Sequence, residues 1–95
     1  MELTQFEINL FKKHITLYTV GMAIKRGIEP TEKNLMKILD ESDEAIDSAL
    51  AFKVFTNPDE EIDQDDFCDY SFTVCMEEFG EDIMEQIVEV MEQFQ

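Results

Sequence analysis

Basic residues are scarce in this sequence, and they are missing from most of its second half. Seven Lys and Arg stand against 23 Asp and Glu in 95 residues, which gives a formal net charge of −16, and no Lys or Arg follows Lys53. Proteins bind DNA or RNA largely through cationic side chains that neutralise phosphates, and a polybasic membrane anchor needs the same residues. The composition therefore excludes direct nucleic-acid binding and electrostatic anchoring to a membrane surface.

Cysteine, glycine and long apolar runs are also rare. The only cysteines, Cys68 and Cys75, stand seven residues apart, about 10 Å along a helix and more along a strand, which is too far for a disulfide. The three glycines are widely separated, so no glycine-rich phosphate loop is present. About 18 consecutive apolar residues occur nowhere, and the N-terminus lacks the pattern of a secretory signal. These absences predict a soluble cytoplasmic protein with two reduced thiols.

The remaining composition is that of a folded chain. Hydrophobic residues make up 44% and aromatic residues 11%, which is enough to build one small core, so residues 1–95 are predicted to form a single domain. Charge divides this domain into a near-neutral half, residues 1–39 with a balance of +2, and a strongly acidic half, residues 40–95. Within the acidic half, residues 40–53 carry −4 and residues 54–95 carry −14.

Helical signals are clear in the near-neutral half. Thr4 and Glu7 fit a capping box, apolar residues then recur at three- and four-residue steps, and Gly27 fits the position after a helix end, which predicts a helix over about 5–26. Thr31 is a suitable N-cap for a short second helix, and Ser42 for a third that ends before Asn57 and Pro58.

The acidic half is more ambiguous. Residues 59–66 fit either a solvated loop or a helix start. In residues 67–76, apolar and polar side chains alternate as in a strand, but apolar side chains also recur at the three- and four-residue steps of a helix. Residues 81–94 have the pattern of an amphipathic helix. We therefore predict a mainly α fold, a small bundle of three to five helices, with a short β-hairpin at about 52–55 and 70–74 as an allowed addition. An α+β fold is the alternative.

No pattern for catalysis or for a bound metal or cofactor is present. The acidic run 59–69 fails the spacing of a calcium loop, because a loop starting at Asp59 has Gln64 in place of the required Gly and Tyr70 in place of the closing Glu. Weak, non-specific cation binding there is left open. The single histidine, His14, is interpreted as a half-exposed helix residue, since it has no neighbouring His or Cys to complete a zinc site or a catalytic pair. The protein is predicted not to be an enzyme.

The acidic half carries the functional signal. If residues 54–95 were entirely helical, their 14 carboxylates would be spaced about 4.5 Å apart on average, against about 3.4 Å for phosphates along one DNA strand. A net charge of magnitude about 2 to 8 is sufficient to keep a small domain soluble, whereas this chain carries −16, so solubility alone does not explain the acids. Repulsion among so many acids also predicts a fold that is stabilised by monovalent salt and by mild acidification.

In size, composition and charge asymmetry, residues 40–95 resemble the small acidic DNA-mimic proteins with which phages block bacterial restriction or CRISPR nucleases. The resemblance implies a non-enzymatic inhibitor in the bacterial host cytoplasm, whose carboxylates replace phosphates in the basic cleft of a nuclease or effector complex. Steric block, allostery and induced dimerisation all fit this pattern. The predicted contact residues are Asp59, Glu60, Glu61, Asp63, Asp65, Asp66, Asp69, Glu77, Glu78, Glu81 and Asp82.

A second class of binding protein fits the same composition. An immunity protein or antitoxin for a basic toxin, or an acidic phage assembly chaperone, would bind a protein partner through an apolar groove. The aromatic residues predicted to form such a groove are Phe67, Tyr70, Phe72 and Phe79. Binding through the groove would survive high salt, whereas the affinity of a charge mimic would fall steeply.

Overall fold

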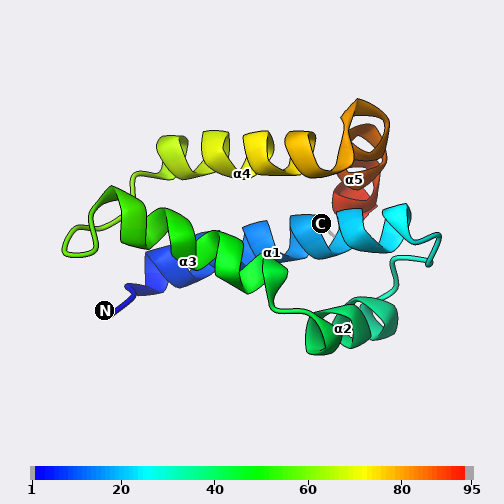
Figure 1. Ribbon diagram of the computed structural model, residues 1–95, viewed down its shortest axis with the longest axis horizontal. Helices are drawn as coiled ribbons and strands as arrows, with labels where there is room; N and C mark the ends of the chain where they lie inside the picture. Colours follow the sequence, from blue (N-terminus) through cyan, green and yellow to red (C-terminus); the bar gives the residue numbers. More distant parts are fainter. Residues whose placement is uncertain (1, 94–95) are drawn as a thin grey trace.

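The computed structural model describes residues 2–93, and within that range the chain forms five helices and no strand (Figure 1). The predicted helical bundle is confirmed. Segments 52–55 and 70–74, which were allowed as a hairpin, both lie inside helices. The helices are α1 (Gln5–Lys25), α2 (Glu32–Glu41), α3 (Glu44–Thr56), α4 (Gln64–Phe79) and α5 (Glu81–Gln93).

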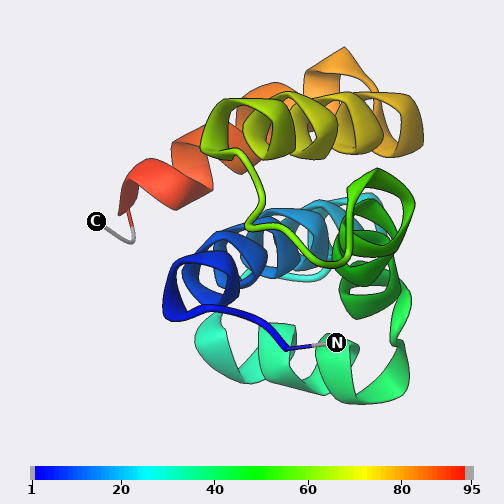
Figure 2. The same ribbon diagram turned by 90° about the vertical axis from the view of Figure 1, so that its left-hand side faces the viewer.

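The first helix is the centre of the molecule and contacts all four others. Figure 2 shows α4 and α5 on one side of α1 and α2 on the other. Its start is the predicted capping box, in which the Glu7 amide donates to Thr4 Oγ1 at 3.1 Å and the Thr4 amide donates to Glu7 Oε1 at 3.0 Å. Its end is also as predicted, because Gly27 has a φ of 72° and the Ile28 amide donates back to the Ala23 carbonyl.

The ambiguous segment after Pro58 forms a loop followed by α4. Asp63 is the N-cap, and its carboxylate accepts hydrogen bonds from the amides of Asp65 and Asp66. The buried side chains of α4 then recur at steps of four: Phe67, Ser71, Cys75 and Phe79. This helical phase prevails over the alternating one because the side chains that it buries all pack against α1, whereas the alternating pattern includes the exposed Phe72.

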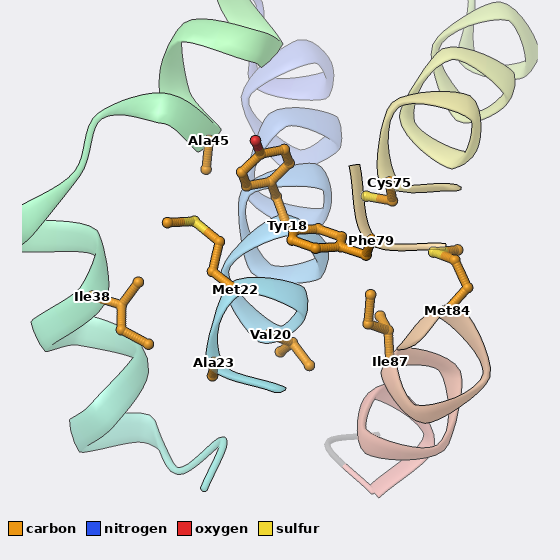
Figure 3. Close-up of a cluster of buried hydrophobic side chains, with 10 residues drawn as sticks. All are labelled: Tyr18, Val20, Met22, Ala23, Ile38, Ala45, Cys75, Phe79, Met84 and Ile87. Atoms are coloured by element: carbon orange, nitrogen blue, oxygen red, sulfur yellow. The ribbon is translucent and has the colours of Figure 1, made fainter. Parts of the chain in front are cut away.

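Two apolar clusters form the core. The larger joins the C-terminal half of α1 to α2, the first turn of α3, α4 and α5, and within it the rings of Tyr18 and Phe79 meet edge to face with their centroids 5.2 Å apart (Figure 3). Gly21 permits this packing, because a Cβ atom there would lie 2.4 Å from the Phe79 ring. The smaller cluster joins the N-terminal half of α1 to α3 and the first turn of α4, with Phe11 stacked on Phe67.

A tight turn separates the last two helices. Gly80, with a φ of 86°, lies between them and turns the chain so that α5 packs on α1 as well as on α4. The C-terminal helix is thus confirmed as far as Gln93, and the predicted member Phe94 lies outside the described residues. Across residues 2–93, no helix has an apolar stretch long enough to cross a bilayer.

Candidate functional site

All eleven acidic residues predicted as contacts are exposed to solvent, but they do not form one cluster. Seven of them belong to residues 59–69, in the loop before α4 and its first turns. The other four, between Glu77 and Asp82, surround the turn into α5 at the opposite end of α4 (Figure 1). At 1.5 Å per residue, about 20 Å of helix separates Asp65 from Glu78. The acids therefore form two groups, one at each end of α4, and no acid lies between Asp69 and Glu77.

Few of these charges are neutralised by bases. In the described chain, residues 2–93, two ion pairs form, and the only one at the surface joins Lys25 Nζ to Glu78 Oε1 at 3.7 Å. The other takes Lys53, the single base of the acidic half, into the interior, where its side chain is 2% exposed. The exposed bases lie in α1, directly after its end, or in α2. They are Lys12, Lys13, Lys25, Arg26, Lys33 and Lys37. The 14 acids between Asp59 and Glu92 all face solvent.

Residues 57–63 between α3 and α4 form the acidic loop. Its carboxylates do not converge on a cation site. Among residues 2–93, no group of three or more His, Cys, Asp or Glu side chains is placed to hold a metal ion. A shallow hollow of about 170 Å³ lies between the end of α3 and the loop, with Glu60, Glu61 and Asp66 in its lining. These side chains are exposed to solvent, which suits an electrostatic contact with another molecule better than coordination of an ion.

A buried ion pair holds the acidic loop in place. Lys53 Nζ lies 2.5 Å from Glu7 Oε2 and also donates to the Glu60 carbonyl, and Glu7 Oε2 accepts the Ile62 amide at 3.0 Å. Burial opposes ionisation of Glu7. The hydrogen bond from Lys53, the amides of Thr4 and Ile62 and the charge of Lys53 outweigh it and lower the Glu7 pKa below its usual value. The pair thus joins α1 and α3 to the loop that carries the largest group of acids.

Sequence analysis missed this pair. Glu7 was interpreted only as part of the capping box, and Lys53 only as one charge among many. One signal was available: Lys53 is the last basic residue in the chain, and it follows the helical phase of Ala45 and Ala49, both of which are buried.

His14 is buried, so the prediction of a half-exposed residue is wrong. Its Nδ1 lies 2.6 Å from Ser71 Oγ on α4 and its Nε2 lies 3.1 Å from Ser48 Oγ on α3. Burial lowers the His14 pKa to about 4, so the ring is neutral at pH 7. The prediction failed because the neighbouring Lys12 and Lys13 point to solvent while the next residue of the helix faces the core.

His14 Nδ1 and Ser71 Oγ are as close as a catalytic base and its nucleophile, but their surroundings differ from those of a catalytic pair. The second ring nitrogen contacts a hydroxyl where a catalytic pair has a carboxylate that orients the imidazole. The ring is also enclosed by aromatic side chains, with Phe67 edge-on at 5.7 Å. We therefore interpret this group as a polar connection that joins α3 and α4 to α1. Tyr70 supports it by donating to the Ser48 carbonyl.

An apolar groove of about 270 Å³ lies between α1, α4 and α5. Of the four aromatic residues predicted to form a groove, Phe67 and Phe79 are buried in the core and Tyr70 is half-buried, because the helical phase of α4 turns them inward. Phe72 is exposed and lines the groove together with Phe67. The groove therefore exists, but it is formed by residues from three helices that no single sequence window contains.

The two thiols differ in environment. Cys68 is exposed, and Cys75 is buried, where desolvation raises its pKa to about 11. Both are free, as predicted, and both line the apolar groove. The elevated pKa of Cys75 leaves very little thiolate at pH 7, so this residue is a packing element of the core.

The site was also compared with known proteins. A scan of protein-family models matched nothing, and neither the curated proteins nor the solved structures contained a match.

Proposed function

We propose that this protein is a non-enzymatic inhibitor that occupies the basic nucleic-acid-binding cleft of a bacterial defence nuclease, of the restriction or CRISPR type. One observation carries the proposal: 14 acidic side chains between Asp59 and Glu92 face solvent, and Glu78 alone among them contacts a base. So much uncompensated charge destabilises a small monomer, and a cationic partner would relieve the repulsion.

The spacing of the acids supports phosphate mimicry. Acids four residues apart on one helix face are separated by a rise of about 6 Å, which is close to the rise of about 7 Å that separates every second phosphate of a DNA strand. Asp65 and Asp69 on α4, and Glu81, Glu85 and Glu89 on α5, follow this spacing. Because Gly80 folds α5 back onto the bundle, the two helices that carry these rows, α4 and α5, lie on one side of α1 (Figure 2).

Long-range attraction would bring such a surface to its target. Opposite charges raise the rate of association, and the effect extends over a Debye length of about 8 Å at physiological salt. The buried Glu7 and Lys53 pair holds the acidic loop in one conformation, so less ordering is needed on binding. The proposal places the protein in the bacterial cytoplasm, in agreement with its two free thiols.

A competition assay tests the proposal. A labelled target duplex is bound to a purified guide-loaded CRISPR effector or to a restriction enzyme, and the protein is titrated in while anisotropy is measured. We expect displacement of the duplex at 50 mM NaCl and a loss of affinity of at least tenfold at 300 mM, because screening weakens the contacts. If the enzymes of both classes retain their DNA in excess protein, the proposal is wrong.

Matched variants separate the effect of the predicted contact residues from that of net charge. In one variant, four predicted contacts are neutralised as Asp59→Asn, Glu61→Gln, Asp66→Asn and Glu77→Gln. In the control, four exposed acids of the other side are neutralised as Glu29→Gln, Glu32→Gln, Asp40→Asn and Glu41→Gln. Both sets remove four charges, so only the first should reduce competition strongly. Equal losses would show that total charge, and not this face, determines binding.

The apolar groove favours a second candidate function. An immunity protein, antitoxin or assembly chaperone would bind its protein partner through apolar contacts, and the exposed Phe72 lies at such a surface. This function is distinguished by salt, since apolar affinity should change less than threefold between 50 and 300 mM NaCl.

A further inference from the structure

The groove between α1, α4 and α5 has an apolar floor and an exposed apolar rim. Leu10 and Leu17 of α1, Phe67 and Cys75 of α4 and Met84 of α5 line its interior. Phe72 on α4 and Val88 on α5 line its edge and remain 54% and 47% exposed. Large apolar side chains left open beside a groove are typical of a protein interface.

The two edges of this groove formed by α4 and α5 are acidic. Asp69 lies one helical turn before Phe72, and Glu85 lies one turn before Val88, so a carboxylate stands next to each exposed apolar side chain. Glu92 lies one turn beyond Val88. On the α1 side the groove is lined by the exposed Lys13. Lys13 is thus the one charged side chain in the lining of the groove, and the carboxylates flank this lining on the α4 and α5 sides.

We propose that the groove binds an amphipathic helix of a partner protein, with an apolar stripe flanked on one side by Lys or Arg. The stretch of α4 that lines the groove, from Phe67 to Cys75, is about 12 Å long and matches two turns of a helix. Two turns present anchors at positions i, i+4 and i+7, which is the usual mode of helix-in-groove binding. The acidic edges favour a basic flank, and Lys13 favours an acidic residue on the opposite flank of the bound helix.

This inference concerns the apolar groove and does not depend on the mimicry of nucleic acid, although Asp69 and Glu85 beside the groove also belong to the rows of acids proposed to mimic phosphates. The groove is lined by α1, α4 and α5, whereas the largest group of acids surrounds the loop before α4. A partner that contains both a basic cleft and a basic helix would contact both surfaces.

Synthetic helices test the proposal on the full-length protein. The probe is a fluorescent 16-residue peptide with Leu at i, i+4, i+7 and i+11 and Lys along one flank. One comparison peptide has Glu in place of Lys, and another has the Lys peptide's composition in scrambled order. We expect the Lys peptide to bind at least tenfold more tightly than either comparison peptide. Equal affinity for the scrambled peptide would overturn the proposal, because binding would then reflect charge alone.

Matched substitutions locate the binding surface. Phe72→Ser with Val88→Ser removes both exposed apolar side chains of the groove, and Val54→Ser with Phe55→Ser removes the same residue types from α3. The control residues are 54% and 86% exposed, so both double variants are expected to fold, as checked by circular dichroism. We expect at least a tenfold loss of peptide affinity in the groove variant and less than a twofold loss in the control. Equal losses would overturn the proposal.

Two further measurements complete the test. Asp69→Asn with Glu85→Gln should reduce the preference for the Lys peptide over the Glu peptide at least fivefold, and an unchanged preference would contradict the acidic edges. Sedimentation velocity of the full chain tests whether a second copy occupies the groove. If the chain forms a dimer that Phe72→Ser with Val88→Ser dissociates, the occupant is a second copy and the proposed partner helix is wrong. The groove variant should still compete in the nuclease assay, so failure of either proposal is seen separately.

Discussion

Removing one member of the buried Glu7 and Lys53 pair should destabilise the protein more than removing any surface ion pair. The side chains of Lys53 and Glu7 are 2% and 0% exposed, so loss of one partner leaves an uncompensated charge in the interior. Such substitutions destabilise proteins by about 3 to 5 kcal/mol. A 95-residue domain has a total stability of about 5 to 14 kcal/mol, so the expected loss is a large fraction of it.

The assay is equilibrium unfolding in urea at pH 7, followed by the helical circular dichroism signal. Glu7→Gln leaves Lys53 without a counter-ion and keeps a single oxygen, which can accept from only one of the Thr4 and Ile62 amides. Lys53→Met leaves the Glu7 carboxylate with two amide donors. With an m-value of about 1.5 kcal/mol/M, a loss of 3 to 5 kcal/mol lowers the midpoint by about 2 to 3 M urea. The double variant Glu7→Gln with Lys53→Met removes both charges and should be more stable than either single variant.

Lys25→Met is the matched control. Lys25 and Glu78 are 3.7 Å apart, and their side chains are 56% and 45% exposed, so this pair should contribute at most about 1 kcal/mol. The reasoning is refuted if Lys53→Met lowers stability no more than Lys25→Met, or if the effects of Glu7→Gln and Lys53→Met simply add in the double variant. Amide exchange at Ile62 gives a second readout, because its amide donates to Glu7 and should exchange faster in Glu7→Gln.

Three other properties follow from the structure. The His14 pKa is about 4 in the folded state and about 6.5 in the unfolded state. Acidification from pH 7 to 4 should therefore lower the free energy of unfolding by about 3 kcal/mol, because the unfolded chain takes up a proton that the folded state excludes. The free energy of unfolding of His14→Gln should depend less on pH. Gly21→Ala should destabilise the protein by about 1 to 3 kcal/mol because the new methyl group overlaps the Phe79 ring. The loss should be smaller in a Phe79→Leu background, and equal losses in both backgrounds would contradict the overlap. The melting temperature should rise between 20 and 300 mM NaCl, since the exposed acids are largely unpaired in the described chain, and a flat response would show that their repulsion is negligible.

The pH prediction changes one conclusion drawn from the sequence. Repulsion among carboxylates alone predicts that mild acidification stabilises the fold. Burial of His14 contributes with the opposite sign between pH 6.5 and 4, because the folded state excludes the proton that the unfolded state binds. Glu7 adds to the loss at lower pH, since its carboxylate is stabilised only while it is ionised and its pKa is lowered. We therefore expect a net loss of stability on acidification.

Local signals were sufficient for several helix boundaries, but not for the start of α3, whose N-cap is Asp43 and not the predicted Ser42, or for the start of α4. The capping box at Thr4, the glycine after α1 and the stop at Pro58 depend on residues within a few positions of one another, so they were predicted correctly. The same holds for the exposure of the acids, because a carboxylate without a partner stays in water. Only the segment at 67–76 had two valid phases, and local sequence does not choose between them.

Long-range packing decided everything else. Glu7 and Lys53 are 46 residues apart, and His14 and Ser71 are 57 apart, so nothing in their immediate sequence announces these pairs. The groove likewise combines three helices whose relative placement depends on Gly80 and on contacts with α1. The sequence by itself determined where α1 begins and ends, where α3 ends and where charge accumulates, because those properties depend on neighbouring residues. Tertiary structure decided which polar side chains are buried and which apolar ones stay exposed, because burial depends on what the rest of the chain brings alongside.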